Sequence, residues 1–501
     1  MSTSTSSEAR APGATVPLII GNKDVTTPNT FDVNNPGKGY VEHKSSTADT
    51  EHATLAVESA EKAFPEWSST KPATRRDILL KTADIFLARK DEFVGYMCEE
   101  TGSQPDFAEF ILMLGVNLLK DVAGKVSGIE AASPALVQEG TSALVYKQPY
   151  GVVLGIAPWN APYILGTRAV ALPIAAGNST VLKGSEFSPK CFWAIGDAFR
   201  QAGLPDGCLN VIYSRPADAP EVTQTLIAHP AVKKLSFTGS TIIGRKVALL
   251  AAQYIKPVIL ELGGKAPTVV LEDADIEKAA LGATLGSFIH TGQVCMCTER
   301  IIVHRSIADK FREALKATVN NVLGGPSTQL VAVNPAAIAK NKDLVRDAIS
   351  KGGKVLIGDL DTEATSNTRM GPVVVENVTE DMDIYKTESF GPTASLFVVE
   401  SDDEAIKLAN DTEYGLSASV YTESLARGLK VAKQIDSGYV TSWWFLWMFS
   451  NEINRAVHIN SMTVHDEAAL PHGGVKSSGY GRFGTNMLDE FLWTKSVTWV
   501  D

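Results

Sequence analysis

Several features that would assign a chain to a membrane, nucleic-acid-binding or extracellular class are missing from this sequence of 501 residues. No apolar run approaches the roughly 18 residues that a membrane-spanning helix needs. The formal net charge of −11 comes without a basic patch, which excludes a nucleic-acid-binding surface. The five cysteines are an odd number with no paired spacing, so we expect no disulfide framework and a reducing compartment such as the cytoplasm.

Targeting and metal-binding signals are also missing. Residues 1–16 are rich in Ser, Thr and Ala but lack the apolar core of a secretion signal, and Glu8 with a single Arg10 is unlike a mitochondrial signal. We expect a disordered tail there. Cys295 and Cys297 form a C-x-C pair, but no second Cys or His pair stands nearby at ligand spacing, so no metal site is predicted.

Hydrophobic periodicity predicts an α/β protein. Between residues 50 and 130, apolar residues recur every three or four positions, which indicates helices. After residue 150, short β-branched runs alternate with helical segments, the pattern of a doubly wound domain with a parallel sheet. A second α/β portion follows from residue 267, and the length predicts two or three domains. The predicted strands are 151–158, 179–185, 209–214, 233–239 and 256–264, and the predicted helices, each ending near a glycine, are 169–177, 189–203 and 241–254.

Three residues far apart in the chain together describe the oxidation of an aldehyde through a covalent thioester. Cys295, in TGQVCMCTER (291–300), stands 34 positions after Glu261 and 135 after Asn160. A thiolate attacks an aldehyde readily and leaves again from a thioester. An amide N–H such as that of Asn160 stabilises the developing oxyanion by roughly 3 kcal/mol. Glu261 would activate water for hydrolysis, which calls for a carboxylate with a raised pKa.

Each of these residues also has an ordinary structural explanation. A lone Cys is more often a buried small hydrophobe, a Glu at a strand end is usually a solvated charge or a cap, and an Asn after Pro-Trp is usually a turn residue. Five flanking motifs weigh against these explanations: FTGSTIIGR (237–245), LELGGKAP (260–267), GQVCMCTER (292–300), ESFGP (388–392) and GGVKSSGYGRFG (473–484).

In order and spacing, the motifs resemble those of the NAD(P)-dependent aldehyde dehydrogenase superfamily, from about residue 17 to residue 501. The segment HINSMTVHDEAALPHGGVKSSGYGRFG (458–484) looks most like the benzaldehyde, vanillin and salicylaldehyde dehydrogenase branch. The resemblance implies a small β oligomerisation flap and a homodimer or homotetramer. It implies an NAD-binding domain over 17–137 and 151–265, a catalytic domain over 266–475, and the flap from 138–150 and 485–501, in which SALVYKQPY (142–150) pairs with the closing strand.

Cofactor binding is predicted without the familiar G-x-G-x-x-G motif, which is absent. Gly239 and Ser240 stand between a predicted strand and helix, where backbone N–H groups can face a pyrophosphate, although Ser at a helix start is also ordinary capping. By resemblance, Lys183 and Glu186 contact the adenosine ribose, although the family more often has Pro where this chain has Gly184. A carboxylate there would repel a 2′-phosphate, so NAD is favoured over NADP. By resemblance, Glu388 and Phe390 hold the nicotinamide ribose and ring, and the remaining cofactor residues are Trp159, Gly244 and Leu262.

The substrate is predicted to be a polar aromatic aldehyde. Tyr163, Ile164 and Arg168 follow Asn160 on one predicted helix and could line a tunnel, although Arg168 could equally be a surface residue. Where the family commonly has PFGG, this chain has His472 in place of Phe, which would make the tunnel more polar.

The largest departure from the family pattern is a segment of 17 residues at 441–457, which holds three of the eight tryptophans. One interpretation is a lid or a membrane-interface anchor, since Trp-rich apolar segments do such work. The other, which we favour, is a retained short intron. The segment corresponds to 51 nucleotides, a multiple of three, and its deletion restores SGYVHINSM, which the family pattern expects. The activity of this exact chain depends on which interpretation holds.

The sequence therefore predicts an NAD-dependent, hydrolytic aldehyde dehydrogenase acting on an aromatic aldehyde. A CoA-acylating semialdehyde dehydrogenase is the nearest enzymatic alternative, but transfer to CoA does not require a water-activating base such as Glu261. A non-catalytic NAD-binding protein, with its site blocked by 441–457, is the alternative from another class.

Overall fold

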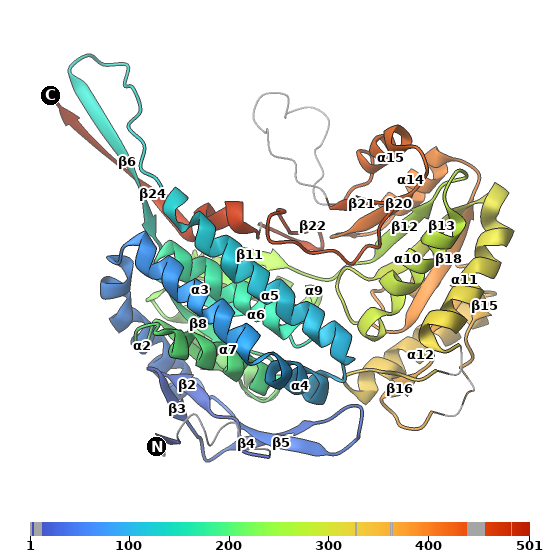
Figure 1. Cartoon of the computed structure of the whole chain (residues 1–501), viewed down its shortest axis with the longest axis horizontal. Coiled ribbons are helices and arrows are strands. Elements are labelled where there is room, and N and C mark those ends of the chain that lie inside the picture. The colour runs from blue at the N-terminus through green and yellow to red at the C-terminus, as the bar shows by residue number, and fades with distance from the viewer. Residues whose placement is uncertain are drawn as a thin grey trace.

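The computed structural model describes residues 3–4, 13–325, 328–360, 362, 364–437, 456–481 and 483–501. It contains two large sheets and a long two-stranded ribbon (Figure 1). The predicted insertion at 441–457 lies outside the described residues except for Ala456 and Val457. In the described part of the chain, no helix is both long and apolar enough to cross a membrane.

The first sheet has the doubly wound arrangement predicted from the sequence. Its parallel centre runs β9-β8-β7-β10-β11, so the chain starts in the middle and winds outward in both directions. Antiparallel strands extend both edges, with β23 (Gly479–Tyr480) beside β11. The central strands are β7 (Val152–Ile156), β8 (Ser179–Lys183), β9 (Leu209–Ile212), β10 (Val232–Thr238) and β11 (Val258–Glu261), and β1 (Thr3–Ser4), β3 (Lys23–Val25) and β2 (Leu18–Ile20) form the other edge.

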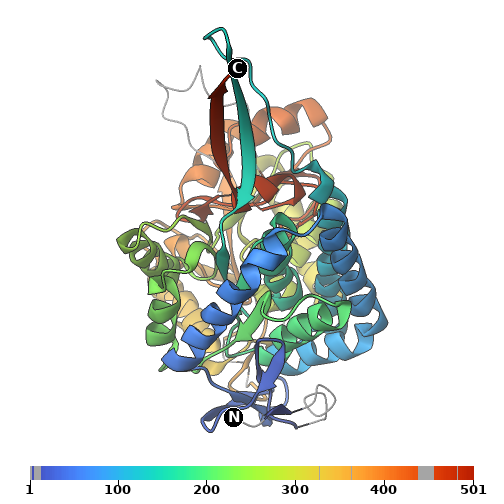
Figure 2. The same ribbon diagram turned by 90° about the vertical axis from the view of Figure 1, so that its left-hand side faces the viewer.

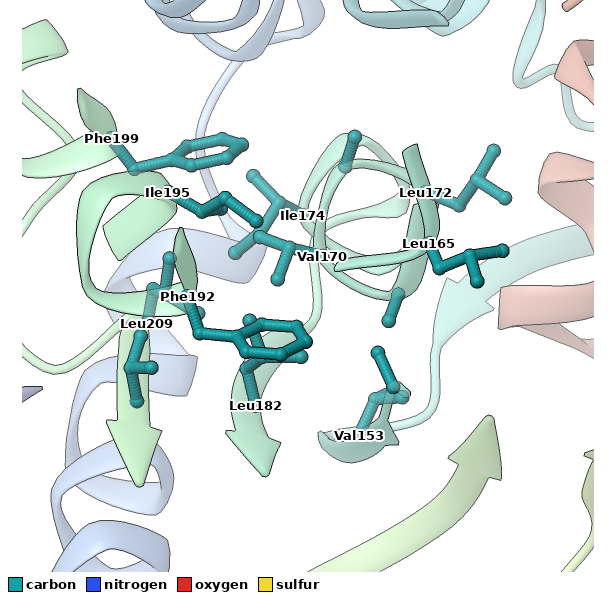
Figure 3. Packing of buried hydrophobic residues seen from close by; sticks show 14 of the residues in the cluster. Val153, Leu165, Val170, Leu172, Ile174, Leu182, Phe192, Ile195, Phe199 and Leu209 are labelled. Carbon is teal, nitrogen blue, oxygen red and sulfur yellow. The ribbon is translucent and has the colours of Figure 1, made fainter. Parts of the chain in front are cut away.

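Helices between these strands lie where they were predicted, although α6 (Pro162–Ala176) begins at Pro162 rather than at 169 and α9 (Thr241–Gln253) does not end near a glycine. Helices α6 and α7 (Pro189–Ala202) end at glycines in the left-handed conformation, Gly177 and Gly203. Helix α9 instead ends at Tyr254, so the expected glycine stop is wrong there. Figure 3 shows side chains of α6 and α7 packed over the strands, with Phe192 beside Leu182. This packing fixes the strand ends that carry the site. Helix α8 (Ala219–Ala228) completes the set.

The N-terminal region is helical, as predicted for residues 50–130. Its helices are α2 (Thr50–Ser68), α3 (Pro72–Ala88), α4 (Lys90–Thr101) and α5 (Pro105–Lys125), followed by the short η1 (Val126–Gly128). An antiparallel hairpin, β4 (Thr30–Asn34) with β5 (Val41–Ser46), precedes them. The predicted disordered tail, 1–16, contains structure near both of its ends: Thr3–Ser4 pair with β3, and Val16 is buried with its backbone bonded to Lys44 and Ser46.

The second sheet is parallel except at its β15 edge, in the order β15-β17-β18-β13-β12-β20-β21. Adjacent residues of its strands enter different cores: Val269 and Ile302 belong to one apolar cluster, whereas Val270 and Ile301 belong to another. Because side chains alternate along a strand, the sheet is buried on both faces. The strands are β12 (Ala266–Val270), β13 (Thr298–His304), β15 (Lys354–Ile357), β17 (Val373–Glu376), β18 (Thr393–Val399), β20 (Ala418–Tyr421) and β21 (Val457–Ile459).

Helices cover this sheet, and short pairs of strands complete the fold. The helices are α10 (Ile276–Phe288), α11 (Ala308–Leu323), α12 (Pro335–Ser350), α13 (Asp383–Lys386), α14 (Asp402–Asn410) and α15 (Leu425–Ala432), with η2 (Ile289–Gly292), η3 (Arg305–Ile307) and η4 (Thr485–Phe491). The small pairs are β14 (Leu330–Val331) with β16 (Arg369–Met370) and β19 (Tyr414–Gly415) with β22 (Val475–Lys476).

A two-stranded ribbon projects from the body of the molecule (Figures 1 and 2). It pairs β6 (Thr141–Pro149) with β24 (Leu492–Val500) antiparallel over their whole length, from Leu492↔Pro149 to Val500↔Thr141. This confirms the predicted pairing of the closing strand. Large apolar side chains on it are exposed, including Trp493, Trp499 and Val500.

Candidate active site

Cys295 and Glu261 meet where the two sheets approach each other. Glu261 is the last residue of β11, and Cys295 lies between η2 and β13. The Cys295 Sγ lies 3.6 Å from Oε1 of Glu261. Burial raises the pKa of the Cys295 thiol well above its ordinary value, and the carboxylates of Glu261 and Glu388 raise it further. The thiol therefore needs a nearby proton acceptor before it can attack, and Oε1 is within reach.

The Glu261 carboxylate is almost fully buried and has two cationic or potentially cationic neighbours. Oε2 accepts a hydrogen bond of 3.1 Å from Arg168, and Oε1 lies 3.2 Å from Nε2 of His472. Burial alone would raise the pKa of Glu261, but His472 and Arg168 outweigh it and lower this pKa to about 2. The raised pKa expected from the sequence is therefore wrong for this state of the site, because two cations face a carboxylate that the sequence shows alone.

Asn160 enters the same site from the turn between β7 and α6. Its Nδ2 donates a hydrogen bond of 3.0 Å to the carbonyl oxygen of Gln293, two residues before Cys295. An amide carries two N–H bonds, so one remains for an oxygen beside Cys295. The contact also ties the Cys295 loop to the first sheet.

A narrow cavity leads to Cys295. Its volume is about 30 Å³, so a ring-sized group needs movement of side chains such as Phe110, which is 36% exposed. Three residues that were predicted to line a substrate tunnel, Ile164, Arg168 and His472, line this cavity together with Asn160, Glu261 and Cys295. The rest of the wall is mostly apolar and includes Phe107, Phe110, Ile111, Leu114, Leu165, Val294, Met296 and Val464.

Tyr163 does not line this cavity, so its predicted role in the substrate tunnel is wrong. Its ring is fully buried, stacks on Phe93 at 5.3 Å between ring centres, and donates its hydroxyl group to the Phe93 carbonyl oxygen. Burial raises the pKa of Tyr163 well above its ordinary value. Because α6 is buried all round, one of its faces meets the cavity and another meets α4.

Arg168 is buried rather than on the surface. Its guanidinium donates to Glu261 and to Asp466, and lies over the ring of Phe483 at 5.4 Å. Asp466 had no role in the sequence prediction, since a single Asp in a polar loop carries no signal of its own.

The predicted pyrophosphate residues cluster at the start of α9. Ser240 caps this helix, with its hydroxyl oxygen accepting from Ile243 N at 3.5 Å, as its ordinary explanation predicts. A Cβ on Gly239 would lie 2.7 Å from the Phe237 ring, and one on Gly244 would overlap the Leu262 side chain. These glycines therefore allow close approach of the helix start to the strand ends.

Lys183 and Glu186 lie at the end of β8, on the same edge of the sheet. Lys183 is 7% exposed, and its ammonium group makes no hydrogen bond within the described part of the chain. Burial lowers the pKa of Lys183, while Glu186 opposes that change. Glu186 accepts a hydrogen bond of 3.1 Å from Ser185 and lines a separate cavity beside Phe187.

Glu388, Phe390 and Trp159 form the other side of the predicted cofactor site. Oε1 of Glu388 accepts from Gly264 N at 2.8 Å, and a Cβ on Gly263 would lie 2.5 Å from Oε2. Burial and the nearby carboxylate of Glu299 raise the pKa of Glu388 to about 7. The rings of Trp159 and Phe390 meet edge to face, 6.0 Å apart.

Sequence reasoning missed the buried ion pair that holds this loop. Lys265 donates to Glu299 and to the Thr387 carbonyl oxygen, and Glu299 accepts from the backbone N–H groups of Ser389 and Phe390. Both charged residues belong to the quoted motifs LELGGKAP and GQVCMCTER, which was the available signal. His290, stacked on Phe107 at 4.7 Å and edge-on to Trp159, was also missed.

Comparison with known proteins gives one consistent result. The model of the aldehyde dehydrogenase family matches residues 24–497. A vanillin dehydrogenase of Pseudomonas sp. (strain HR199) is 42% identical over 477 residues, covering 94% of each chain. The solved salicylaldehyde dehydrogenase of Pseudomonas putida G7, complexed with salicylaldehyde, has a TM-score of 0.90 and 35% identity, over 97% of this chain and 98% of that chain. An NADP-dependent enzyme of E. coli has a TM-score of 0.88 and 29% identity, over 97% of this chain and 98% of that chain. The predicted family and fold class are thus confirmed.

Proposed function

Because this chain belongs to the aldehyde dehydrogenase family, and is therefore an NAD(P)-dependent oxidoreductase acting on aldehydes, we propose that its substrate is aromatic, its cofactor is NAD and its nucleophile is Cys295. The observation that carries the assignment of residues is the position of Glu261 Oε1, 3.6 Å from Cys295 Sγ, in a cavity that also holds Asn160. The CoA-acylating and non-catalytic alternatives are not favoured.

The first step is the attack of Cys295 on the aldehyde carbon. The Sγ–H proton passes to Oε1 of Glu261, the new C–S bond forms, and the carbonyl π electrons move to oxygen. The free N–H of Asn160 and the backbone N–H of Cys295 then stabilise the oxyanion, and one such donor contributes about 3–4 kcal/mol.

NAD, when bound, accepts the hydride that leaves the substrate carbon. The residues at the sheet edge fit this cofactor. The buried ammonium group of Lys183 makes no hydrogen bond within the described residues and suits a ribose hydroxyl group, and Gly239 and Gly244 let the start of α9 lie close to the strand ends. Glu186, beside Lys183, would repel a 2′-phosphate, which favours NAD over NADP. Glu388 and Phe390 would bind the nicotinamide half.

Hydrolysis completes the reaction. Glu261 first releases to solvent the proton that it took from Cys295. It then removes a proton from water, the water oxygen bonds to the thioester carbon, and the C–S bond breaks to release the carboxylic acid and the Cys295 thiolate. Arg168 keeps Glu261 in place through Oε2, which leaves Oε1 for proton transfer.

The cavity supports a hydroxylated aromatic aldehyde. Phe107, Phe110 and Leu114 form apolar walls, whereas Arg168, Asp466 and His472 form a polar end. Such a combination suits a ring that carries a hydroxyl group. Relatives named for vanillin and salicylaldehyde support the same substrate class.

The assembly is proposed to be a homodimer or homotetramer in the cytoplasm. The ribbon projects from the body of the molecule, and its side chains Trp493, Val497 and Trp499 are exposed, which suits a surface covered by another copy of the chain. All five cysteines are free thiols, in agreement with a reducing compartment. Light scattering after size-exclusion chromatography tests the assembly.

A screen for NADH formation tests the proposed function. Benzaldehyde, salicylaldehyde and vanillin are compared with propanal and succinate semialdehyde, each with NAD or NADP and with or without CoA. We expect the highest kcat/KM for a hydroxylated aromatic aldehyde with NAD and no effect of CoA. A preference for the aliphatic aldehydes, or acyl-CoA as the product, would overturn the proposal.

A further inference from the structure

His472 faces the same oxygen of Glu261 as the nucleophile does. Oε1 lies 3.6 Å from Cys295 Sγ and 3.2 Å from His472 Nε2, while Oε2 is occupied by Arg168. Oε1 is therefore the oxygen that exchanges protons. Two titratable side chains lie next to it, those of Cys295 and His472.

The backbone fixes His472 in this position. Its N–H donates to the Phe483 carbonyl oxygen at 2.8 Å, and the Phe483 N–H donates back to the His472 carbonyl oxygen at 2.7 Å. The side chain is only 7% exposed. Nε2 lies 3.2 Å from Oε1 of Glu261, close enough for a proton to pass, but the ring is outside hydrogen-bond geometry in this state, so the transfer requires a small rotation of the ring.

Four charged or titratable groups surround His472. Glu261 faces it from β11, Arg168 from α6, and Asp466 from the preceding loop, while His458 of β21 interacts with it electrostatically. Burial lowers the pKa of His472, but Glu261 and Asp466 outweigh burial, and Arg168 opposes them; the net effect is a raised pKa. The ring therefore keeps a proton to higher pH than an ordinary histidine does.

We propose that His472 takes from Glu261 the proton that Glu261 removes from water, and thereby restores the base within each turnover. This inference rests on the proposed function of Glu261. In the balanced step, water gives one proton to Oε1, its oxygen bonds to the thioester carbon, and the C–S bond breaks. The proton then moves from Oε1 to His472 Nε2. The products are the carboxylic acid, the Cys295 thiolate and protonated His472, so the charge is conserved.

The same geometry makes hydrolysis depend on the charge of His472. A protonated His472 ring beside Oε1 lowers the pKa of Glu261, which makes Glu261 a weak base. Such a ring also cannot accept a proton from Glu261. Hydrolysis of the thioester therefore requires neutral His472 and slows as pH falls. His472 acts through Glu261, so it is a positioning residue. The phenylalanine that the family commonly has at this place could not perform the transfer.

Two substitutions separate this role from a structural one. His472→Gln keeps a polar side chain that does not titrate, and His472→Phe introduces the common family residue. His304→Gln is the matched control, because His304 lies at the end of β13 away from Cys295 and its ring bonds to Ser306 and to the Glu400 carbonyl oxygen. The full chain is assayed from about pH 6 to about pH 9 for the NADH burst, the steady-state rate and hydrolysis of 4-nitrophenyl acetate without NAD.

Both His472 variants should form NADH in a burst. At alkaline pH their steady-state rate should be lower than that of the native chain by about tenfold or more. The acyl-enzyme should accumulate, visible by intact mass, and the rise of kcat with pH should disappear, with KM nearly unchanged. Both variants keeping the kcat and pH profile of the native chain, or both losing the burst together with turnover, would overturn the inference. Glu261→Gln distinguishes the two proposals. If its acyl-enzyme, once formed, hydrolyses as fast as that of the native chain, the role of Glu261 fails; if hydrolysis is slowed in Glu261→Gln but not in His472→Gln, only the role of His472 fails.

Discussion

Arg168 bridges two buried carboxylates, donating one hydrogen bond of 3.1 Å to Glu261 and another to Asp466. All three side chains are nearly inaccessible, with side-chain exposures of 4%, 1% and 10%. The bridge joins β11, α6 and the loop before His472. Removing one member of a buried charge network leaves the others without compensation, which is more costly than the net contribution of the network itself.

Arg168→Met should therefore destabilise the protein by about 3–5 kcal/mol, because two buried carboxylates lose their cation. The loss is measured by chemical denaturation monitored by tryptophan fluorescence. Arg245→Met is the control, since Arg245 forms a surface pair with Glu413 and should change the stability little. Equal stability of the two variants would mean that the Arg168 network is not coupled to folding.

Cys295→Ala should abolish NADH formation, whereas Cys297→Ala should retain it. Burial raises the pKa of both thiols, but only Cys295 lies beside Oε1 of Glu261 and lines the cavity that holds Asn160, whereas Cys297 is 3% exposed and does not line it. Single-turnover NADH fluorescence with saturating aldehyde makes the comparison. An active Cys295→Ala variant beside an inactive Cys297→Ala variant would reverse the assignment.

Glu186→Gln should narrow the preference for NAD over NADP. Removal of the carboxylate weakens the contact with the 2′-hydroxyl group and removes repulsion of a 2′-phosphate. The ratio of kcat/KM for the two cofactors is the readout. Ser185→Ala, which removes the 3.1 Å hydrogen bond to Glu186 but keeps its charge, is the matched control. Equal use of both cofactors by the native chain would contradict this role.

Gly244→Ala should destabilise the protein by about 1–3 kcal/mol, because the new Cβ overlaps Leu262. It should also weaken NAD binding by displacing the start of α9. Gly95→Ala in α4 is the control: nothing lies within 4 Å of its added Cβ, and alanine favours the helix by about 0.5–1 kcal/mol. Thermal unfolding and NAD titration report the two effects. A stabilised Gly244→Ala variant would contradict the packing argument.

Deletion of residues 441–457 tests the two interpretations of the insertion. Val457 begins β21 and pairs with Ala418, and after the deletion Val440 stands directly before His458. The strand thus keeps a valine at that place. If the segment is a retained intron, the shortened chain should be more soluble and at least as active. A folded, soluble deletion variant with clearly lower kcat/KM on its preferred aldehyde would support the lid instead, and the transcript sequence decides the origin.

The strands of the first sheet could be predicted from the sequence because they are buried on both faces. Parallel strands covered on both faces become continuous β-branched runs, and the five predicted runs became β7 to β11. The pairing of β6 with β24 needed the resemblance, since alternation along one strand does not identify its partner.

The site was predictable by residue type but not by environment. Cys295, Glu261 and Asn160 meet as expected, yet the direction of the Glu261 pKa shift depends on Arg168 and His472, which are 93 positions before and 211 after it. Tyr163 was placed wrongly because every residue of α6 is buried. Without a polar face, helical periodicity cannot show which side meets a cavity and which meets the core.

The ribbon also constrains the order in which the molecule can be completed during synthesis. β6 ends at Pro149, but its partner β24 begins only at Leu492, so β24 is synthesised long after β6. β11 likewise waits for β23 at 479–480 to cover its edge. Throughout elongation the nascent polypeptide therefore carries two open strand edges, which are templates for pairing with other chains. Loss of β24 alone would leave the catalytic residues in place but would expose the edge of β6 to other chains permanently.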